Sequence, residues 1–324
     1  MPLITFLICS WKAPASLDDT LQSVAAQPSP HLFETLLVNN GFSDQRSAAL
    51  LETYPRINLR IIREPTPGLA HARCAGFAQA LGEIIVMIDD DNSLGENFVP
   101  GLADLFEKYP KLGGICPLIL PVWQEPPPSW VPKIGSMCLS YTANDLSQAP
   151  KETQYWPPGD ASRAPRPPGG GMIIHRDVVA CYSARLSASA RANAAAGATR
   201  IKRLHDGHDM AQDHSLYDHI RFTGRGALVA PVLTVYHHIP SSRWRIRALC
   251  RLNYTLCYFY ARWQTLNGLN TTSWKREIWN FIKSILKLPA SVLPGRDSYP
   301  YSLCIVVRHA GRLVGRFSAL RDRD

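Results

Sequence analysis

The stretch Glu83–Asn92, which reads EIIVMIDDDN, decides the fold of this chain. Its five consecutive apolar residues are mostly β-branched, and they predict a strand buried on both faces, as the strands of parallel sheets are. Three carboxylates, Asp89, Asp90 and Asp91, follow at once and emerge at the carboxyl end of that strand. Open α/β sheets place their ligand crevice at this end. Because adjacent carboxylates repel one another, the pattern favours a divalent cation that also carries phosphate ligands, although a solvated acidic turn is the plainer interpretation.

Strands and helices alternate through the first 120 residues. The expected strands are residues 3–9, 35–38, 59–62, 84–88 and 114–120. The expected helices lie between them, one beginning at Ser16 and others over residues 43–54, 68–81 and 100–109. Ser16 and Asp19 have the spacing of a capping box at the start of the first helix. The alternation predicts an α/β fold with a mostly parallel sheet that is covered by helices on both faces.

The pattern changes after residue 120. Residues 121–168 are rich in proline, which indicates a long loop region of the kind that is usually functional. Gly169, Gly170 and Gly171 end this region, and their bare backbone would let a ligand approach closely, unless they form only a flexible turn. A helix over residues 213–222 and a strand over residues 228–236 are expected further on.

Several common sites are absent from the sequence. It contains no P-loop, no dinucleotide fingerprint, no nucleophile elbow and no HExxH pair. The eight cysteines occur singly, without CxxC spacing, so they indicate neither a zinc ribbon nor a disulfide framework but free thiols in a reducing compartment. The N-terminus lacks the pattern of a signal peptide, and no apolar run is long enough to span a membrane. These features favour a cytoplasmic protein.

A pair of histidines, His237 and His238, follows the last expected strand. One of them could join Asp91 in a site with oxygen and nitrogen ligands for Mn²⁺ or Mg²⁺, of which manganese tolerates imidazole better. A histidine after a strand is more often structural. The acid cluster is the reason to consider a metal here.

Six short segments share an order and spacing that together form a pattern. They are Leu36–Asp44 (LLVNNGFSD), Gly68–Gly76 (GLAHARCAG), Ile88–Asn92 (IDDDN), Gly169–Met172 (GGGM), Gln212–Leu216 (QDHSL) and His237–Arg243 (HHIPSSR). In that order they resemble the VVDxGSxD, GxxxARNxG, DxD, acceptor-loop, EDxxL and HxIPxxR segments of family 2 glycosyltransferases. Asp213 also precedes Gly224 by 11 residues, the usual spacing in that family. The resemblance covers roughly residues 1–245 and implies the GT-A fold, a Rossmann-like fold of nucleotide-diphospho-sugar transferases.

The resemblance implies a role for each matching residue. The residues that would hold the nucleotide-sugar donor are Asn39, Arg73, Asp89 and Asp90. The residues that would form the acceptor loop are Gly169, Gly170 and Gly171. Asp91 and His237 would ligate a Mn²⁺ or Mg²⁺ ion that bridges the diphosphate, and Asp213 would take the proton from the acceptor hydroxyl. The implied reaction is an inverting, metal-dependent transfer, with a UDP-sugar as the first expectation for the donor and a glycan or lipid-linked acceptor.

The sequence departs from the family pattern at three places. Asn39 stands where the family usually has Asp, which weakens the expected contact to uracil, and Gln212 stands where it usually has Glu. Asp209 competes with Asp213 for the role of base, although its spacing to Gly224 is 15 residues rather than 11. Two other functions stay open: a degenerate GT-A domain that binds without catalysis, and a nucleotidyltransferase. The second would normally carry a glycine-rich basic loop where this chain has Cys9–Lys12.

Charge is distributed unevenly along the chain. Residues 243–324 hold 15 Lys and Arg and 4 Asp and Glu, a net charge of +11 in a chain whose total is +9. We therefore expect a catalytic domain at residues 1–242, with a nucleotide-binding half (1–120) and an acceptor-binding half (121–242), before a basic, aromatic-rich helical extension. The amphipathic segment 278–288 predicts a helix that either lies on an anionic membrane surface or packs on the catalytic domain. A peripheral position at the inner face of the plasma membrane, and no nucleic-acid partner, are expected.

Overall fold

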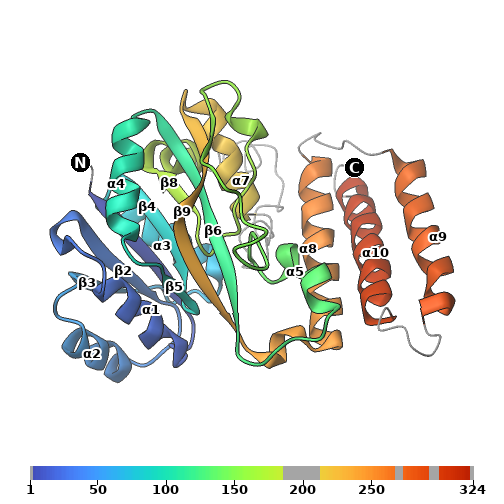
Figure 1. The fold of residues 1–324 in the computed structure, drawn as a ribbon, viewed down its shortest axis with the longest axis horizontal. Helices are drawn as coiled ribbons and strands as arrows, with labels where there is room; N and C mark the ends of the chain where they lie inside the picture. The colour runs from blue at the N-terminus through green and yellow to red at the C-terminus, as the bar shows by residue number, and fades with distance from the viewer. Residues whose placement is uncertain (1–2, 185–211, 267–272, 292–298, 322–324) are drawn as a thin grey trace. The chain divides into compact units, whose positions relative to one another are not determined.

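The computed structural model describes residues 3–184, 212–266, 273–291 and 299–321 (Figure 1). The chain divides into two compact units. The first unit consists of Met1–Val122 and Tyr141–His238, and the second of Trp123–Ser140 and Ile239–Asp324. Residues 123–140 therefore interrupt the first unit in sequence but belong to the second.

A nine-stranded sheet forms the centre of the first unit. Its strands are β1 (Ile4–Ser10), β2 (Phe33–Asn39), β3 (Leu59–Arg63), β4 (Ile84–Asp89), β5 (Asn92–Leu94), β6 (Leu112–Trp123), β7 (Gln154–Trp156), β8 (Ile173–His175) and β9 (Gly226–Ile239). They lie in the order β3-β2-β1-β4-β8-β6-β9-β5, and β7 pairs with β9. The pairs β3–β2, β2–β1 and β1–β4 are parallel, whereas β8 is antiparallel to both β4 and β6.

Helices surround this sheet. They are α1 (Ser16–Ala25), α2 (Asp44–Thr53), α3 (Leu69–Gln79), α4 (Phe98–Lys108), α7 (Gln212–Asp218) and a helical stretch at residues 176–184. Short 3₁₀ turns are η1 (Pro30–Leu32), η2 (Ala161–Arg163) and η4 (His219–Phe222). The predicted fold class, a mostly parallel α/β sheet with helices around it and further helices at the C-terminal end, is confirmed.

Strand β1 shows why the sheet needs helices on both faces. Alternate residues of a strand point to opposite faces. On one face the ring of Phe6 contacts Phe98 of α4, with 6.4 Å between centroids. On the other face Leu7 packs under α3, where Gly76 lets the helix approach: a Cβ on Gly76 would lie 2.3 Å from Leu7 Cδ1. Both side chains of the strand are almost fully buried.

The short strand β8 changes the topology that the sequence suggested. Residues 114–120 were expected to form a further strand of a mostly parallel sheet, but the strand they form, β6, pairs with the antiparallel β8, which lies between β4 and β6. Because β8 runs antiparallel to β4, with Ile173 opposite Val86, its amino end lies at the carboxyl end of β4. The glycine loop Gly169–Gly171 comes just before β8, so this pairing carries the loop to the acid cluster.

In the second unit, two long helices pack against a third. The helices of this unit are α5 (Val131–Cys138), the 3₁₀ turn η5 (Ser241–Trp244), α8 (Ile246–Leu266), α9 (Trp274–Ser291) and α10 (Tyr299–Arg321). The helix α10 packs against both α8 and α9 (Figure 1). None of the helices among the described residues is long and apolar enough to cross a membrane.

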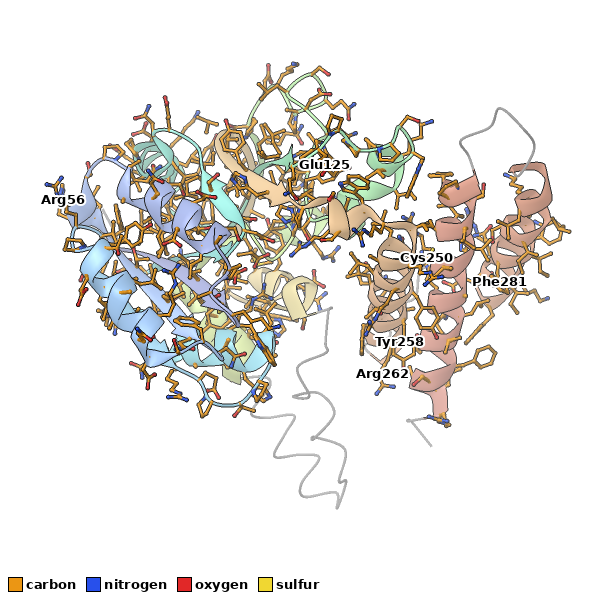
Figure 2. The ribbon with its side chains drawn as sticks, turned by 90° about the horizontal axis from the view of Figure 1, so that it is seen from below. Arg56, Glu125, Cys250, Tyr258, Arg262 and Phe281 are labelled. Atoms are coloured by element: carbon orange, nitrogen blue, oxygen red, sulfur yellow. The ribbon has the colours of Figure 1, made fainter. Side chains whose placement is uncertain are left out.

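The contact between α8 and α10 is close because of two glycines. A Cβ on Gly311 or Gly315 would lie 2.5 or 2.1 Å from a backbone carbonyl oxygen of α8, so a larger residue would push the helices apart. Tyr258 and Arg262, which Figure 2 labels on α8, both donate a hydrogen bond to Ser318 Oγ of α10, at 3.0 and 3.1 Å.

A buried carboxylate joins the amino-terminal side of the parallel strands. Glu34 on β2 is fully buried, and its Oε1 accepts hydrogen bonds from Thr5 Oγ1 of β1 and from the Leu81 amide before β4, at 2.7 and 2.6 Å. Its Oε2 accepts from Arg60 Nε of β3 at 2.9 Å. One side chain therefore links four neighbouring segments at the edge opposite the acid cluster.

We predict that Glu34→Ala lowers the free energy of unfolding by about 3 kcal/mol, because it leaves buried donors without an acceptor and removes the partner of Arg60. Urea unfolding followed by circular dichroism measures this change. The matched control is Glu52→Ala on the exposed side of α2, which we expect to change stability by less than about 0.5 kcal/mol. Equal stability of the two variants would contradict the structural role of Glu34.

Candidate functional site

The candidate site lies where β2, β1 and β4 end. The parallel register places Ser10 beside Asn39 and Cys9 beside Asp89, so the three strands finish at the same edge of the sheet. Asn39 is two strands from the acid cluster, roughly 10 Å at the usual strand spacing. A nucleotide could extend along this edge.

Asp89 lies between a cation and a glycine. A guanidinium nitrogen of Arg73, a buried residue of α3, lies 3.9 Å from Asp89 Oδ1. On the loop before β8, a Cβ on Gly170 would lie 2.1 Å from Asp89 Oδ2, so only glycine fits there without moving the carboxylate. The Asp89 side chain is still 37% exposed, which leaves room for a ligand contact.

Asp90 is held by two serines. Its Oδ2 accepts a hydrogen bond from Ser10 Oγ at 2.5 Å, and its backbone carbonyl accepts one from Ser16 Oγ at 2.8 Å. The expectation of a capping box at Ser16 was wrong: no side chain caps α1, and the hydroxyl of Ser16 binds the acidic loop instead. The contacts of Asp90 with the segments after β1 thus fix the turn between β4 and β5.

Asp91 meets His237 because β5 pairs with β9. This antiparallel pairing puts Asn92 opposite His237, and the His238 amide donates to the Asp91 carbonyl at 2.9 Å. His237 Nε2 lies 3.6 Å from Asp91 Oδ1, and the His237 ring is almost fully buried. His238 takes another direction, since its Nε2 lies 2.8 Å from Ser93 Oγ.

The glycine loop is tied to the acidic turn by Asn92. The Asn92 amide nitrogen donates to the Gly170 carbonyl at 2.6 Å, while its Oδ1 is buried and has no hydrogen-bond partner among the described residues. Gly171 has a φ of +146°, a conformation that other residues rarely adopt, and a Cβ there would also strike Ile119. The loop therefore requires its glycines for both backbone shape and space.

The side chains at this edge fit a divalent cation. A separation of 3.6 Å between a carboxylate oxygen and an imidazole nitrogen can be bridged by one ion, because such metal–ligand distances are about 2.0–2.2 Å. In the described part of the chain no cluster of three or more His, Cys, Asp or Glu side chains could hold a metal by itself. Asp91 and His237 could therefore supply two ligands, with phosphate oxygens and water as the others, which is how Mg²⁺ is usually held beside phosphates.

The loop after β2 is built by two asparagines. Asn39 Oδ1 accepts from the amides of Gly41 and Phe42, and its Nδ2 donates to the Phe42 carbonyl at 2.9 Å. Asn40 ties the same loop to residues 64–68 through three hydrogen bonds. The amide of Asn39, expected to bind the nucleotide, is thus already engaged within its own loop.

Trp11 also lies at this edge, and the sequence analysis did not single it out. The residue follows β1, is about half exposed, and lies so close to Gly41 that a Cβ there would be 3.0 Å from the Trp11 carbonyl oxygen. The feature of the sequence that could have indicated a site residue here is its position directly after the first strand. An exposed indole beside a glycine offers a flat apolar surface to an aromatic ring.

Cys9 cannot serve as a nucleophile here. Burial raises the pKa of its thiol to about 12, and the nearby carboxylates of Asp89 and Asp90 add to the effect while Arg73 opposes it. The thiol therefore stays protonated at neutral pH, and only the thiolate is reactive.

The proposed base lies on a helix whose end is anchored. Asp213 is the second residue of α7, and the other end of this helix is held by Asp218, which is buried and accepts from Arg166 Nε at 2.6 Å. Asp209 and the side chains of Gln212 and Asp213 lie outside the described residues.

Part of the chain resembles known glycosyltransferases. Residues 5–155 match the family model described as "Glycosyl transferase family 2". A glucosyl-dolichyl phosphate glucuronosyltransferase from Haloferax volcanii is 22% identical over 134 residues, which are 40% of this chain and 42% of that enzyme. This chain thus matches less than half the length of its archaeal relative.

Solved structures extend the likeness of the fold to almost the whole chain. S. aureus TarS 1–349 superposes with a TM-score of 0.51 at 13% identity, over 99% of this chain and 92% of that one. TarS 1–349 in complex with UDP-GlcNAc gives a TM-score of 0.51 at 13% identity, over 98% and 92%. Together, the comparisons show that residues 5–155 resemble family 2 glycosyltransferases and that the chain has the GT-A fold of the TarS structures.

Proposed function

We propose that the protein is an inverting, metal-dependent glycosyltransferase that moves a sugar from a nucleotide-diphosphate donor to a hydroxyl group. One observation carries the proposal: Asp89, Asp91 and His237 gather with Gly170 at the carboxyl end of β4. Open α/β sheets bind nucleotides at this end. The family match supports the same reaction class.

The donor would lie along the edge from β2 to β4. Trp11 would offer its exposed ring to the base, and the loop that Asn39 shapes would border it. Asp89, with Asp90 behind it, would bind near the ribose, while Arg73 would hold Asp89 in place and face the diphosphate. A UDP-sugar is the proposed donor, since the TarS structures contain UDP or UDP-GlcNAc in the same fold.

Asp91 and His237 would hold Mn²⁺ or Mg²⁺ next to the diphosphate. A divalent ion at this position supplies charge stabilisation to the leaving nucleotide diphosphate. Asp213 would accept the proton of the acceptor hydroxyl as that oxygen attacks the anomeric carbon from the side opposite the leaving group, so configuration inverts. Gly169–Gly171 would line the acceptor side and leave space for it.

The acceptor is proposed to be a glycan or a lipid-linked sugar. The name of the archaeal relative describes transfer involving glucosyl-dolichyl phosphate, a lipid-linked sugar, which favours the second class. The net charge of +11 on residues 243–324 supports a location at an anionic membrane surface, which we place at the cytoplasmic face.

We predict that Asp91→Asn removes metal-dependent binding of UDP, because it takes away the charged ligand beside His237. Calorimetric titration of UDP with and without Mn²⁺ measures the effect, and we expect a loss of at least about tenfold in affinity with metal present. Asp104→Asn on the exposed face of α4 is the matched control and should bind like the unaltered protein. UDP binding that is metal-dependent and equal in all three proteins would contradict the assignment of Asp91.

Gly170→Ala tests the close approach of the glycine loop. The added methyl group collides with the Asp89 carboxylate, so we expect weaker UDP binding with little change in the unfolding midpoint. Gly101→Ala on α4 meets only Leu233 Cδ2 at 3.2 Å and serves as the control. An unchanged UDP affinity of Gly170→Ala would show that Asp89 is not part of the donor site.

Asp213→Asn tests the base. We expect kcat to fall by about 10²- to 10⁴-fold while UDP affinity stays the same, because a base acts on the acceptor rather than on the donor. Transfer is measured as UDP release in the presence of acceptor. Asp209→Asn is the comparison variant, and a large fall in kcat there, with none at Asp213→Asn, would move the role of base to Asp209.

A further inference from the structure

The two most buried of the described side chains of α9 are polar. Glu277 and Ser284, two turns apart, are both less than 10% exposed. Glu277 is held by two arginines of α10: its Oε1 lies 3.3 Å from Arg312 Nη2 and its Oε2 lies 3.1 Å from Arg316 Nη1. These ion pairs decide which side of α9 packs against α10.

The outer side of the same helix is apolar. Five large apolar residues lie on it with exposed fractions of 41–70%: Ile278, Trp279, Ile282, Ile285 and Leu286. Their spacing of one, three and four residues places them on a single stripe that covers about a third of the helix circumference. Phe281, labelled in Figure 2, belongs to the other side and is half-buried. The segment 278–288 was predicted to be one amphipathic stripe, but the structure separates Phe281 from its exposed part.

A surface helix usually buries its large apolar residues, whereas α9 leaves five of them exposed. The Glu277 ion pairs fix this arrangement, because turning the apolar stripe inward would remove that carboxylate from Arg312 and Arg316. A contiguous apolar surface that the packing of the folded protein keeps exposed is typical of an interaction site.

The charges around the stripe indicate what binds there. Lys275, Arg276, Lys283 and Lys287 are all exposed on α9, and Lys283 Nζ lies 5.1 Å from the centre of the Trp279 ring. Glu277 is the one acidic residue between Trp274 and Ser291, and it is buried. The exposed charge of this helix is therefore entirely positive, which complements an anionic surface and repels a second copy of the same face.

We propose that α9 docks on an anionic phospholipid bilayer, with the apolar stripe in the headgroup–acyl boundary and the cations on the phosphates. Amphipathic helices with apolar and aromatic residues on one side and lysines beside them bind membranes in this way. An indole such as that of Trp279 is suited to the interface, where one end is apolar and the other is wet. The inference is independent of the donor site, since it rests on the second unit alone.

The test is flotation of the full-length protein with phosphatidylcholine vesicles that contain or lack phosphatidylglycerol, at low and at high salt. We expect binding only to the anionic vesicles, and weaker binding at high salt. Lys283→Gln with Lys287→Gln should lower the partition coefficient about thirtyfold, from about fivefold per cation. Ile282→Asn with Leu286→Asn should lower it by roughly a hundredfold, because two apolar side chains are lost from the interface.

The chain offers matched controls for the apolar variant. Leu81 and Val232 of the first unit are exposed by 59% and 61%, so Leu81→Asn with Val232→Asn removes similar apolar surface elsewhere and should bind vesicles like the unaltered protein. UDP titration on every variant shows whether the donor site is intact, so a failure of membrane docking is distinguished from a failure of the proposed function.

Three results would overturn the proposal. They are equal binding to vesicles with and without phosphatidylglycerol, no binding to either, and anionic binding that the α9 variants leave unchanged. Sedimentation analysis tests the alternative that the stripe binds a second copy of the protein. That alternative would hold if the unaltered protein is a dimer that does not bind vesicles, and if Ile282→Asn with Leu286→Asn converts the dimer to a monomer.

Discussion

The concentration of negative charge at residues 89–91 is the constraint on which the first unit depends. Each of the three carboxylates has a different neighbour: Asp89 lies near the guanidinium of Arg73, Asp90 accepts from Ser10, and Asp91 lies beside His237. Those neighbours come from α3, from the end of β1 and from β9, so the fold has to bring three distant segments to one point. The antiparallel strands β8 and β9 complete this arrangement, since they deliver the glycine loop and the histidine to the end of a parallel strand.

The second unit differs from the first in the interactions that hold its helices together. Its interior is partly ionic, with Glu277 between two arginines and with Arg308 donating to the buried Asn253. Removing one partner of a buried ion pair is strongly destabilising, whereas replacing the whole pair with apolar residues often is not. Such pairs therefore specify the orientation of the helices more than they add net stability. Here the orientation they specify turns an apolar stripe outward. This apolar and basic surface is consistent with the proposal that the protein meets its acceptor at a lipid surface.

Sequence patterns predicted the strands in which the local secondary-structure preference of the residues agrees with their burial in the fold. The four parallel strands are apolar runs. The acid cluster after β4 was predicted to be a ligand site because strands of this kind end at a crevice, and this stays a prediction. The sequence did not predict that the strand β8 separates β4 from β6, because three residues are too few to show the alternation of apolar and polar residues that marks a strand. Ser16 looked like a cap because its spacing to Asp19 fits a capping box, yet a tertiary partner, the Asp90 carbonyl, takes its hydroxyl. The sequence places Trp11 directly after the first strand, but only the adjacency of β1 and β2 brings it beside Gly41.

The proposed function depends above all on Asp91 and His237, which we propose to hold a divalent ion next to a donor diphosphate at the end of β4. The most direct measurement is anomalous diffraction at the manganese edge from crystals of the full chain grown with Mn²⁺ and UDP. We expect one strong peak between the Asp91 carboxylate and His237 Nε2, with the UDP diphosphate in contact with the ion and the base near Trp11. A manganese peak away from these two residues, or UDP bound elsewhere on the first unit, would contradict it.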